Sequence, residues 1–263
     1  MGRKESFLDR IATSFGASAR EAVELVGSIF IFYLKMLRAL PSSITRPHLL
    51  TEQMMILGVQ SIPIVLLTSI FVGAVSAWQV QYIFGDAVPL TYLGAGVGKA
   101  VFTELGPVLT ALVITGRIGA KLAAELGTMK VTEQVDAMVC LSLNPYTYLL
   151  TPRLAASCVM VPILTVFAVA LAIVSAQVIA ETFLGLSFAA FYKGVRLLFK
   201  TQDIQICMAK SFVFGMVISL SGCYYGFHAK GGAVGVGSYT KKAVVAAMVM
   251  VLVSNLILVN VLL

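Results

Sequence analysis

The sequence predicts an all-α integral membrane protein with five transmembrane helices, an N-terminal interfacial amphipathic helix, and a short helix between the second and third spans. The first observation is composition, because 59% of the 263 residues are hydrophobic and 12% are charged. A soluble domain of this length is about 45–50% apolar and about 25% charged. The second observation is that apolar residues gather in stretches long enough to cross a bilayer. Helices that pack within one bilayer form one unit, so we expect a single domain over residues 1–263.

The N-terminal region, residues 1–48, is predicted to lie in the membrane interface. Within it, Glu24 and Lys35 leave only the stretch Leu25–Leu34 without a charge. Ten residues at about 1.5 Å each cannot cross about 30 Å of hydrocarbon. Because basic residues surround this stretch, it is typical of an amphipathic helix that lies along the membrane surface.

Five apolar stretches are predicted to span the membrane. The first contains Pro63 and ends near Trp78 and Tyr82, whose rings favour the headgroup region. The second carries three charged residues, and the fourth requires Lys210 to extend its ammonium group toward the headgroups. The predicted spans are 54–84, 101–124, 154–180, 205–227 and 243–263.

The distribution of Lys and Arg orients the chain, because cytoplasmic loops carry the excess. Five spans place the termini on opposite sides, and fourteen Lys and Arg fall on the N-terminal side against five on the other. The N-terminus is therefore predicted to be cytoplasmic and the C-terminus external. The five outer basic residues are Lys99, Lys193, Arg196, Lys200 and Lys210. Four of them form a basic segment, and the sequence leaves open whether it meets lipid headgroups or a protein partner.

Two connections have informative compositions. Phe183–Thr201 is long and mixed, so a short helix on the outer surface is expected. Gly226–Gly237 is rich in glycine, so a flexible cytoplasmic loop is expected.

The sequence argues against chemistry carried out by this chain. The stretch LGAGVGKA, Leu93–Ala100, lacks both the first glycine and the final Ser or Thr of a phosphate-binding loop. The cysteines have no CxxC spacing, and His48 and His228 lie far apart, so no metal site is expected. No paired carboxylates or nucleophile with a base suggest catalysis, and no basic cluster with interleaved aromatics suggests nucleic acid binding. We therefore expect neither an enzyme nor a cofactor-binding chain.

The second span carries the most unusual residues. Small residues recur every four positions in two rows, Gly116–Ala120–Ala124 and Gly119–Ala123–Gly127, which predicts close packing against neighbouring helices. The charged residues Arg117, Lys121 and Glu125 follow one another on one face near the cytoplasmic end and could pair locally or meet a partner.

Glu104, beside Gly106 and Pro107, has two open interpretations. A carboxylate inside the membrane is costly unless it faces a cavity or a partner charge. Alternatively, the helix begins at Leu105, and Glu104 is a first-turn acid favoured by the helix dipole.

The stretch TMKVTEQVDAM, within residues 127–140, predicts a short amphipathic helix. Thr128 or Thr132 is the candidate N-cap. The apolar residues Val131, Val135 and Met138 would share one face, with Lys130, Glu133 and Asp136 exposed. This helix is either an ordinary surface element or a docking element for a cytoplasmic partner that supplies energy.

The stretch ELGPVLTALVITGRIGAKLAAELGTMKVTEQVDAM, followed by NPYTYLLTPRLAA, resembles the signature of the MlaE/YrbE-type permeases. These are membrane subunits of ABC lipid transporters that work with MCE proteins. The strongest match covers Glu104–Ala156, and the pattern of spans agrees over nearly the whole chain.

The resemblance implies a homodimer in the bacterial inner membrane, with its C-terminus periplasmic and a phospholipid cavity on the dimer axis. It implies ABC ATPase subunits that hold ATP and Mg, a periplasmic MCE-domain protein that is often a hexamer, and in some systems a STAS-domain protein. Such systems maintain outer-membrane lipid asymmetry, and some relatives import sterols. Direction and headgroup preference stay undetermined.

The resemblance also assigns residues. The helix at 127–140 corresponds to the family's coupling helix, with ATPase contacts expected from Lys130, Thr132, Glu133, Gln134 and Asp136. Glu104, with its neighbours Thr103 and Pro107, corresponds to the lipid path. Some members have a basic residue where this chain has Thr103, which leaves an ion pair at that position open here.

Two other classes stay open on the sequence alone. A self-contained channel or secondary transporter for a small apolar solute would show repeated halves with broken helices, and five spans divide poorly into halves. A membrane scaffold without transport would not need Glu104 near the outer leaflet.

Overall fold

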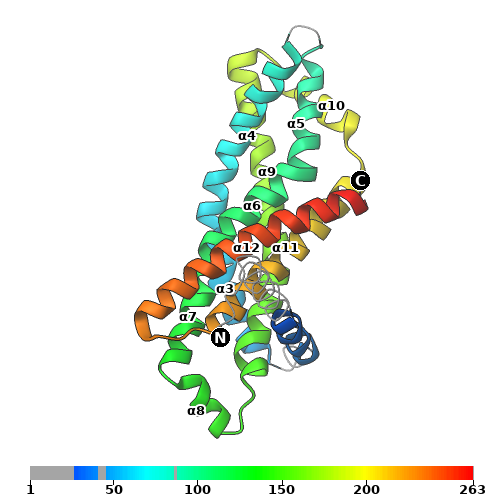
Figure 1. The fold of residues 1–263 in the computed structure, drawn as a ribbon. Coiled ribbons are helices and arrows are strands. Elements are labelled where there is room, and N and C mark those ends of the chain that lie inside the picture. The colour runs from blue at the N-terminus through cyan, green and yellow to red at the C-terminus, as the bar shows by residue number, and fades with distance from the viewer. Residues whose placement is uncertain (1–26, 41–45, 86–87, 263) are drawn as a thin grey trace, which may run out of the picture.

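The computed structural model describes residues 27–40, 46–85 and 88–262, and these residues contain helices and no strand. Five helical stretches in them are long and apolar enough to cross a membrane, which confirms the predicted fold class and number of spans. The elements run alternately up and down through one elongated bundle (Figure 1).

Each of the first three spans is a continuous helix with local changes of winding. The first joins α3 (Pro47–Leu57) to α4 (Ile62–Phe84) through a 3₁₀ turn, Val59–Ser61. The second comprises α5 (Thr91–Ala100), α6 (Gly106–Ile114) and α7 (Ala120–Val131), joined by π-helical turns at Val101–Leu105 and Thr115–Gly119. The third begins with a π-helical turn, Tyr146–Leu150, and continues as α9 (Thr151–Leu184).

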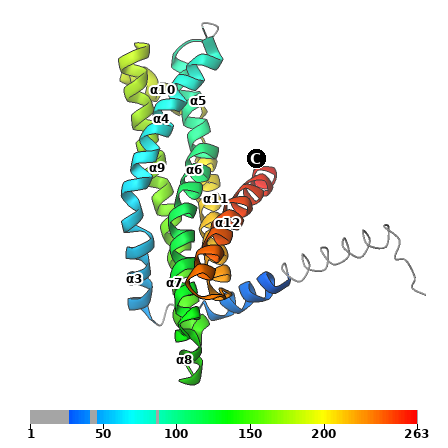
Figure 2. The same cartoon turned by 60° about the vertical axis from the view of Figure 1, so that its left-hand side comes forward.

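Two short helices and two long ones complete the chain. They are α8 (Gln134–Cys140), α10 (Phe188–Leu198), α11 (Thr201–Phe227) and α12 (Gly232–Leu262). Figure 2 shows α8 at one end of the bundle and α10 toward the opposite end, while α12 runs obliquely across the other spans. We refer to these as the α8 end and the α10 end.

Every helix that contains a predicted span extends beyond the predicted bounds, because the charged residues used as boundaries lie inside helices. The helix of the second span begins at Thr91, before residue 101, and the helix of the third begins at Tyr146, before residue 154. The fifth begins at Gly232, so the flexible loop expected at Gly226–Gly237 is wrong over most of its length. Positive φ angles at Gly231 and Gly232 make the sharp turn into α12.

Close helix crossings at glycine hold the bundle together. A Cβ atom on Gly73 of α4 would lie 1.9 Å from the carbonyl oxygen of Ala172 on α9. On α11, a Cβ on Gly226 would lie 2.9 Å from the oxygen of Ala123, so the row Gly119–Ala123–Gly127 faces a close neighbour. The other row is different, because Gly116 is exposed and has nothing within 4 Å of a built Cβ.

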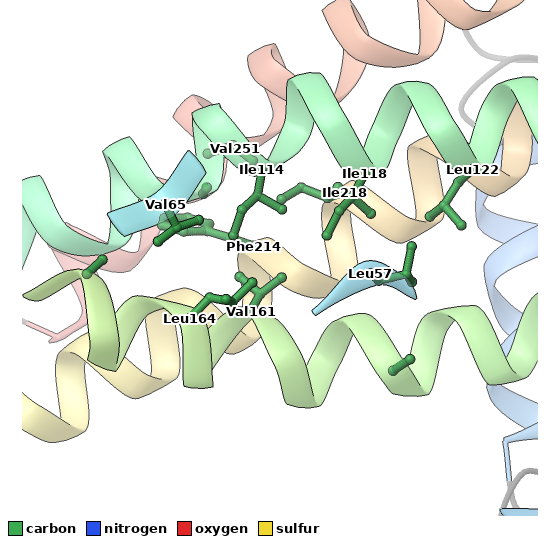
Figure 3. Close-up of a cluster of buried hydrophobic side chains, with 13 residues drawn as sticks. Leu57, Val65, Ile114, Ile118, Leu122, Val161, Leu164, Phe214, Ile218 and Val251 are labelled. Atoms are coloured by element: carbon green, nitrogen blue, oxygen red, sulfur yellow. The ribbon is translucent and has the colours of Figure 1, made fainter. Parts of the chain in front are cut away.

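A buried apolar cluster joins all five spans (Figure 3). Its labelled residues are Leu57, Val65, Ile114, Ile118, Leu122, Val161, Leu164, Phe214, Ile218 and Val251. In a soluble protein, full burial of such a side chain stabilises the fold by about 1.5–3 kcal/mol. In a lipid bilayer, close packing between helices supplies much of the stabilisation instead. The cluster fixes how span two sits against α11 and α12.

Residues 27–39 form a helix that docks at the α8 end. Phe32 and Met36 are buried, and the ring of Phe32 lies 5.6 Å from the rings of both Tyr146 and Tyr224. Phe30 and Ile31 on the same helix are exposed. The greater part of the predicted interfacial region, residues 1–26 and 41–45, lies outside the described residues.

Candidate functional site

Glu104 lies well inside the second span, in the π-helical turn Val101–Leu105. Because the helix begins at Thr91, the first-turn interpretation of Glu104 is wrong. A carboxylate at this depth needs a partner, and π-helical turns within α-helices recur at functional positions.

Pro107 leaves a backbone carbonyl free to bind a cation from another helix. In a regular α-helix the amide of residue 107 would donate to the carbonyl of Thr103, but proline has no amide hydrogen. The free carbonyl of Thr103 accepts a hydrogen bond from Lys210 Nζ of α11 at 2.9 Å. Pro107 therefore opens a binding position for a cation in the helix backbone.

The same ammonium group forms an ion pair with Glu104. The other carboxylate oxygen of Glu104 accepts a hydrogen bond from Asn255 Nδ2 of α12 at 3.0 Å. Glu104, Lys210 and Asn255 thus join three spans, and we call them the Glu104 cluster. The Lys210 side chain is fully buried, whereas that of Glu104 is 36% exposed. The cluster therefore has a sheltered cation and an accessible anion.

One expectation about this region is wrong. Lys210 does not extend to the headgroups, because its ammonium group has the Glu104 carboxylate and the Thr103 carbonyl as partners inside the bundle. The ion pair that Thr103 left open is present, and its cation comes from another span. Lys210 and Asn255 were not identified as site residues, although single polar residues in apolar spans do mark such sites.

A shallow apolar groove includes Leu105, the residue that follows Glu104 in the π-helical turn. It has a volume of about 270 Å³ and lies between α4 and the second span. Its lining residues are Phe71, Val72, Val75, Ser76, Leu105 and Leu109. Leu105 belongs to the same π-helical turn as Glu104, so this turn contributes to both the groove and the cluster.

A second buried ion pair closes the α10 side of the bundle. Lys99 Nζ lies 2.5 Å from Asp203 Oδ1, and the Asp203 side chain is 3% exposed. Asp203 Oδ2 also accepts a hydrogen bond from the backbone amide of Lys200. This pair ties α5 to the start of α11 and neutralises both charges.

Toward the α8 end, Glu125 is the centre of a small charge network. Its carboxylate lies 3.4 Å from Arg153 on α9 and 3.7 Å from Lys121 one turn earlier. Arg153 is buried and also donates to the carbonyl of Leu149 at 2.9 Å. Of the three charges predicted to act together, Lys121 and Glu125 pair locally, while Arg117 forms no ion pair with any described residue.

The segment 127–140 is not one helix. Residues up to Val131 belong to α7, and α8 begins at Gln134. Between them Glu133 adopts a left-handed conformation with φ of 60°, which breaks the helix. Thr132 does not cap α8, because its hydroxyl donates to the carbonyl of Thr128.

A salt bridge holds the two pieces of this segment together. Lys130 Nζ lies 2.7 Å and 3.0 Å from the two carboxylate oxygens of Asp136. Glu133 and Gln134 at the break are exposed, as are Val139 and Leu141 at the other end of α8. The tip therefore presents polar and apolar side chains together, a combination typical of a protein contact surface.

The stretch that resembled a phosphate-binding loop is a packing motif. It forms most of α5, and a Cβ on Gly94 would lie 2.2 Å from the carbonyl oxygen of Phe191 on α10. Gly194 of α10 faces the carbonyl of Thr91 at 2.0 Å in the same way. The glycines allow two helices to touch.

Comparison with known proteins places this arrangement in a family. Residues 50–261 match the family described as "Permease MlaE". The chain belongs to the MlaE permease family. A "Probable ABC transporter permease protein" of Synechocystis is 38% identical over 236 residues, which cover 89% of each chain.

Other members of the family have similar lengths. A probable ABC transporter permease protein from Rickettsia conorii is 34% identical over 94% of this chain and 96% of its own. One from Porphyra purpurea is 35% identical over 84% of this chain and 83% of its own. The chain is thus a multi-pass membrane protein and an ABC permease subunit.

Proposed function

We propose that this MlaE-family permease moves phospholipid between the inner membrane and a periplasmic MCE-domain protein, driven by a separate ABC ATPase. The observation that carries the proposal is the Glu104 cluster, whose partly exposed carboxylate lies in the π-helical turn that also contributes Leu105 to an apolar groove. A phospholipid needs both surfaces, a polar one for its headgroup and an apolar one for its chains.

The cluster also offers an acceptor without a partner. Asn255 Oδ1 is buried and has no hydrogen-bond partner among the described residues. A headgroup hydroxyl or ammonium group could donate to it and to Glu104. Unsatisfied polar atoms in such a place favour a polar ligand group.

The tip formed by the end of α7, Glu133 and α8 is the proposed ATPase-docking element. Glu133, Gln134 and Val139 are exposed at the α8 end, and the second span connects this tip directly to the Glu104 cluster. ATP and Mg would be held by the ATPase, and closure of two ATPase subunits would push on the tip.

A push on the tip would shift the second span against α11 and α12. Such a shift separates Glu104 from Lys210 and Asn255, because these partners lie on the other two helices. The headgroup would then gain or lose its polar contacts as the groove changes shape. In this mechanism the Glu104 cluster is the two-state element that binding and energy input both act upon.

The remaining assembly follows from surfaces and charge. The exposed apolar side chains of α12, among them Leu252, Leu256 and Ile257, face lipid or a second copy in the proposed homodimer. The excess of Lys and Arg supports a cytoplasmic α8 end, with the α10 end toward the proposed periplasmic MCE protein. A STAS-domain protein bound to the ATPase is compatible with this arrangement.

The test is phospholipid transfer by the reconstituted complex containing Glu104→Gln. We expect transfer to fall at least tenfold, while the ATPase still co-purifies with the permease. Glu104→Gln disturbs the cluster less than Glu104→Lys, because a lysine at position 104 would place a second cation beside Lys210.

Glu181→Gln is the matched control, since Glu181 is an exposed acid bonded to Gln177 of its own helix. Transfer by Glu104→Gln at the level of this control would remove Glu104 from the lipid path. Passive flux of a small apolar solute through the permease without its ATPase would instead favour the channel class.

A further inference from the structure

The basic segment between the third and fourth spans separates into two groups of residues. Lys210 is buried inside the bundle, and Lys99, which shares the outer side, is paired with Asp203. In contrast, Lys193 and Arg196 on α10 are exposed and form no ion pair with any described residue. Lys210 and Lys99 are therefore neutralised by carboxylates within the bundle, whereas Lys193 and Arg196 are available to bind an anion.

α10 packs closely on α5 and presents one face outward. Its inner face carries Phe191 and Gly194, both buried, and glycine allows close contact with α5. The side-chain hydroxyl of Ser187 caps its first turn by accepting from the amide of Ala190. A fixed helix can hold cations in a defined geometry without a large entropic cost on binding.

The outward face forms an open groove of about 480 Å³. Its lining residues are Phe188, Ala189, Tyr192, Lys193, Arg196 and Leu197. Lys193 and Arg196 are one turn apart, so their cationic groups lie on one side of the helix. The rings of Phe188 and Tyr192 pack together with centroids 4.6 Å apart. The groove therefore combines two cations with an aromatic wall and an aliphatic one.

We propose that this groove binds the phosphate headgroup of an anionic phospholipid in the leaflet at the α10 end. Lys193 and Arg196 bind the phosphate, while Phe188, Tyr192 and Leu197 contact the glycerol and the first carbons of the chains. α10 connects the ends of two spans, which is where headgroups lie. Basic residues beside exposed aromatic and aliphatic side chains on one helix are typical of membrane-surface helices.

A membrane occupant fits the groove better than an acidic protein. Phe188 is 57% exposed and Leu197 is 53% exposed, and both flank the cations along the helix. Acyl chains of a bilayer would cover these exposed apolar side chains, whereas a purely acidic partner would leave them in contact with water. The groove is separate from the Glu104 cluster, so this inference goes beyond the proposed transport path.

The test measures which lipids the full-length permease retains in mixed micelles that contain equal amounts of phosphatidylglycerol and phosphatidylcholine. Mass spectrometry of the purified protein gives the ratio of bound lipids. Each basic residue near a membrane surface contributes about 1 kcal/mol to anionic lipid binding, so Lys193→Gln with Arg196→Gln should reduce the phosphatidylglycerol enrichment roughly thirtyfold. The charge-conserving pair Lys193→Arg with Arg196→Lys should keep most of it.

A second double variant separates a site from general attraction. Lys230 and Lys241 are also exposed and form no ion pair with any described residue, but they lie at the turn into α12 and its first turns. Lys230→Gln with Lys241→Gln removes the same charge and should leave the enrichment within about twofold of wild type.

Equal losses in the two double variants would overturn the site, as would unchanged enrichment in the α10 variant. The latter result, together with lost binding of the α10 variant to a purified acidic partner domain, would assign the groove to protein contact. All variants should elute as single species in gel filtration, because the exchanged side chains are exposed.

Discussion

At the scale of single residues, the arrangement around Glu104 depends on the absence of one amide hydrogen. Pro107 frees the carbonyl of Thr103, Lys210 binds that carbonyl and Glu104 together, and Asn255 completes the contacts of the carboxylate. Each polar group is tolerable in the membrane only because the others are present. The cluster is therefore both a brace between three spans and a candidate headgroup site.

Removing the cation should expose this dependence. Lys210→Met keeps much of the side-chain volume but leaves Glu104 without its counter-ion, so we expect the free energy of unfolding to fall by about 2–4 kcal/mol. Unfolding of the purified permease in mixed detergent micelles measures the change.

The double variant Lys210→Met with Glu104→Gln should regain more than half of that loss, because no unpaired charge remains. It should still fail in lipid transfer, since the proposed anionic contact is gone. Independent, additive losses in the two single variants would contradict the description of Glu104 and Lys210 as a coupled pair.

The sequence indicated Glu104 but not its partners, and the reason is physical. Lys210 and Asn255 are separated from Glu104 by 106 and 151 residues, and only the packing of three helices brings them together. The apolar sequence around Lys210 suggested that its ammonium group reaches the headgroups, because a lysine without a partner in a span can extend in that way. The Glu104 carboxylate, which lies within reach inside the bundle, is the partner that the ammonium group takes instead.

At the scale of elements, uncharged runs predicted the number of spans but not their ends. Charged residues such as Lys99 and Arg153 were used as boundaries, yet each has a partner that lets the helix continue past it. Glycine was also a poor guide to loops, because Gly94 and Gly235 both lie within helices. Glycine in a membrane helix more often marks a close crossing.

The tip between the second and third spans illustrates a limit of periodicity. The pattern of Val131 and Val135 fits one helix, but Glu133 between them adopts a left-handed conformation that few non-glycine residues take. The bridge from Lys130 to Asp136 spans this break. Two of the five residues expected to contact the ATPase are therefore engaged with each other.

This pairing sharpens the choice of variants for the docking element. Glu133→Lys with Gln134→Lys changes two exposed side chains and leaves the bridge intact, so we expect the ATPase to be lost from the purified complex. Co-purification in mild detergent, with the ratio of ATPase to permease quantified, gives the readout. The expected loss is at least tenfold.

Glu181→Lys is the control, since Glu181 is an exposed acid near the end of α9, outside the docking element. It should keep ATPase binding above half of the wild-type ratio. Full retention of the ATPase by the Glu133 and Gln134 variant would exclude this tip as the docking element.

At the scale of the whole molecule, the native cysteines offer a direct test of orientation. Cys140 at the end of α8 is exposed, whereas Cys207 and Cys223 are buried. A membrane-impermeant maleimide should therefore label Cys140 in inside-out vesicles and leave it unlabelled in intact spheroplasts, if the α8 end is cytoplasmic. Cys140→Ser should abolish the labelling.

A cysteine placed at Ser187, which is exposed at the start of α10, should react from the opposite side. Labelling of Cys140 in intact spheroplasts would reverse the assignment of both ends. The proposed sides for the ATPase and for the MCE protein would then be exchanged as well.

We propose that this permease works as the lipid-binding membrane subunit of a larger ATP-driven assembly. Native mass spectrometry of the complex, purified in mild detergent from its own cells, tests this proposal most directly. We expect two permease copies with ABC ATPase subunits, an MCE-domain protein and bound phospholipid that is depleted by Glu104→Gln. A single permease chain without ATPase, whose bound lipid is the same in wild type and Glu104→Gln, would contradict it.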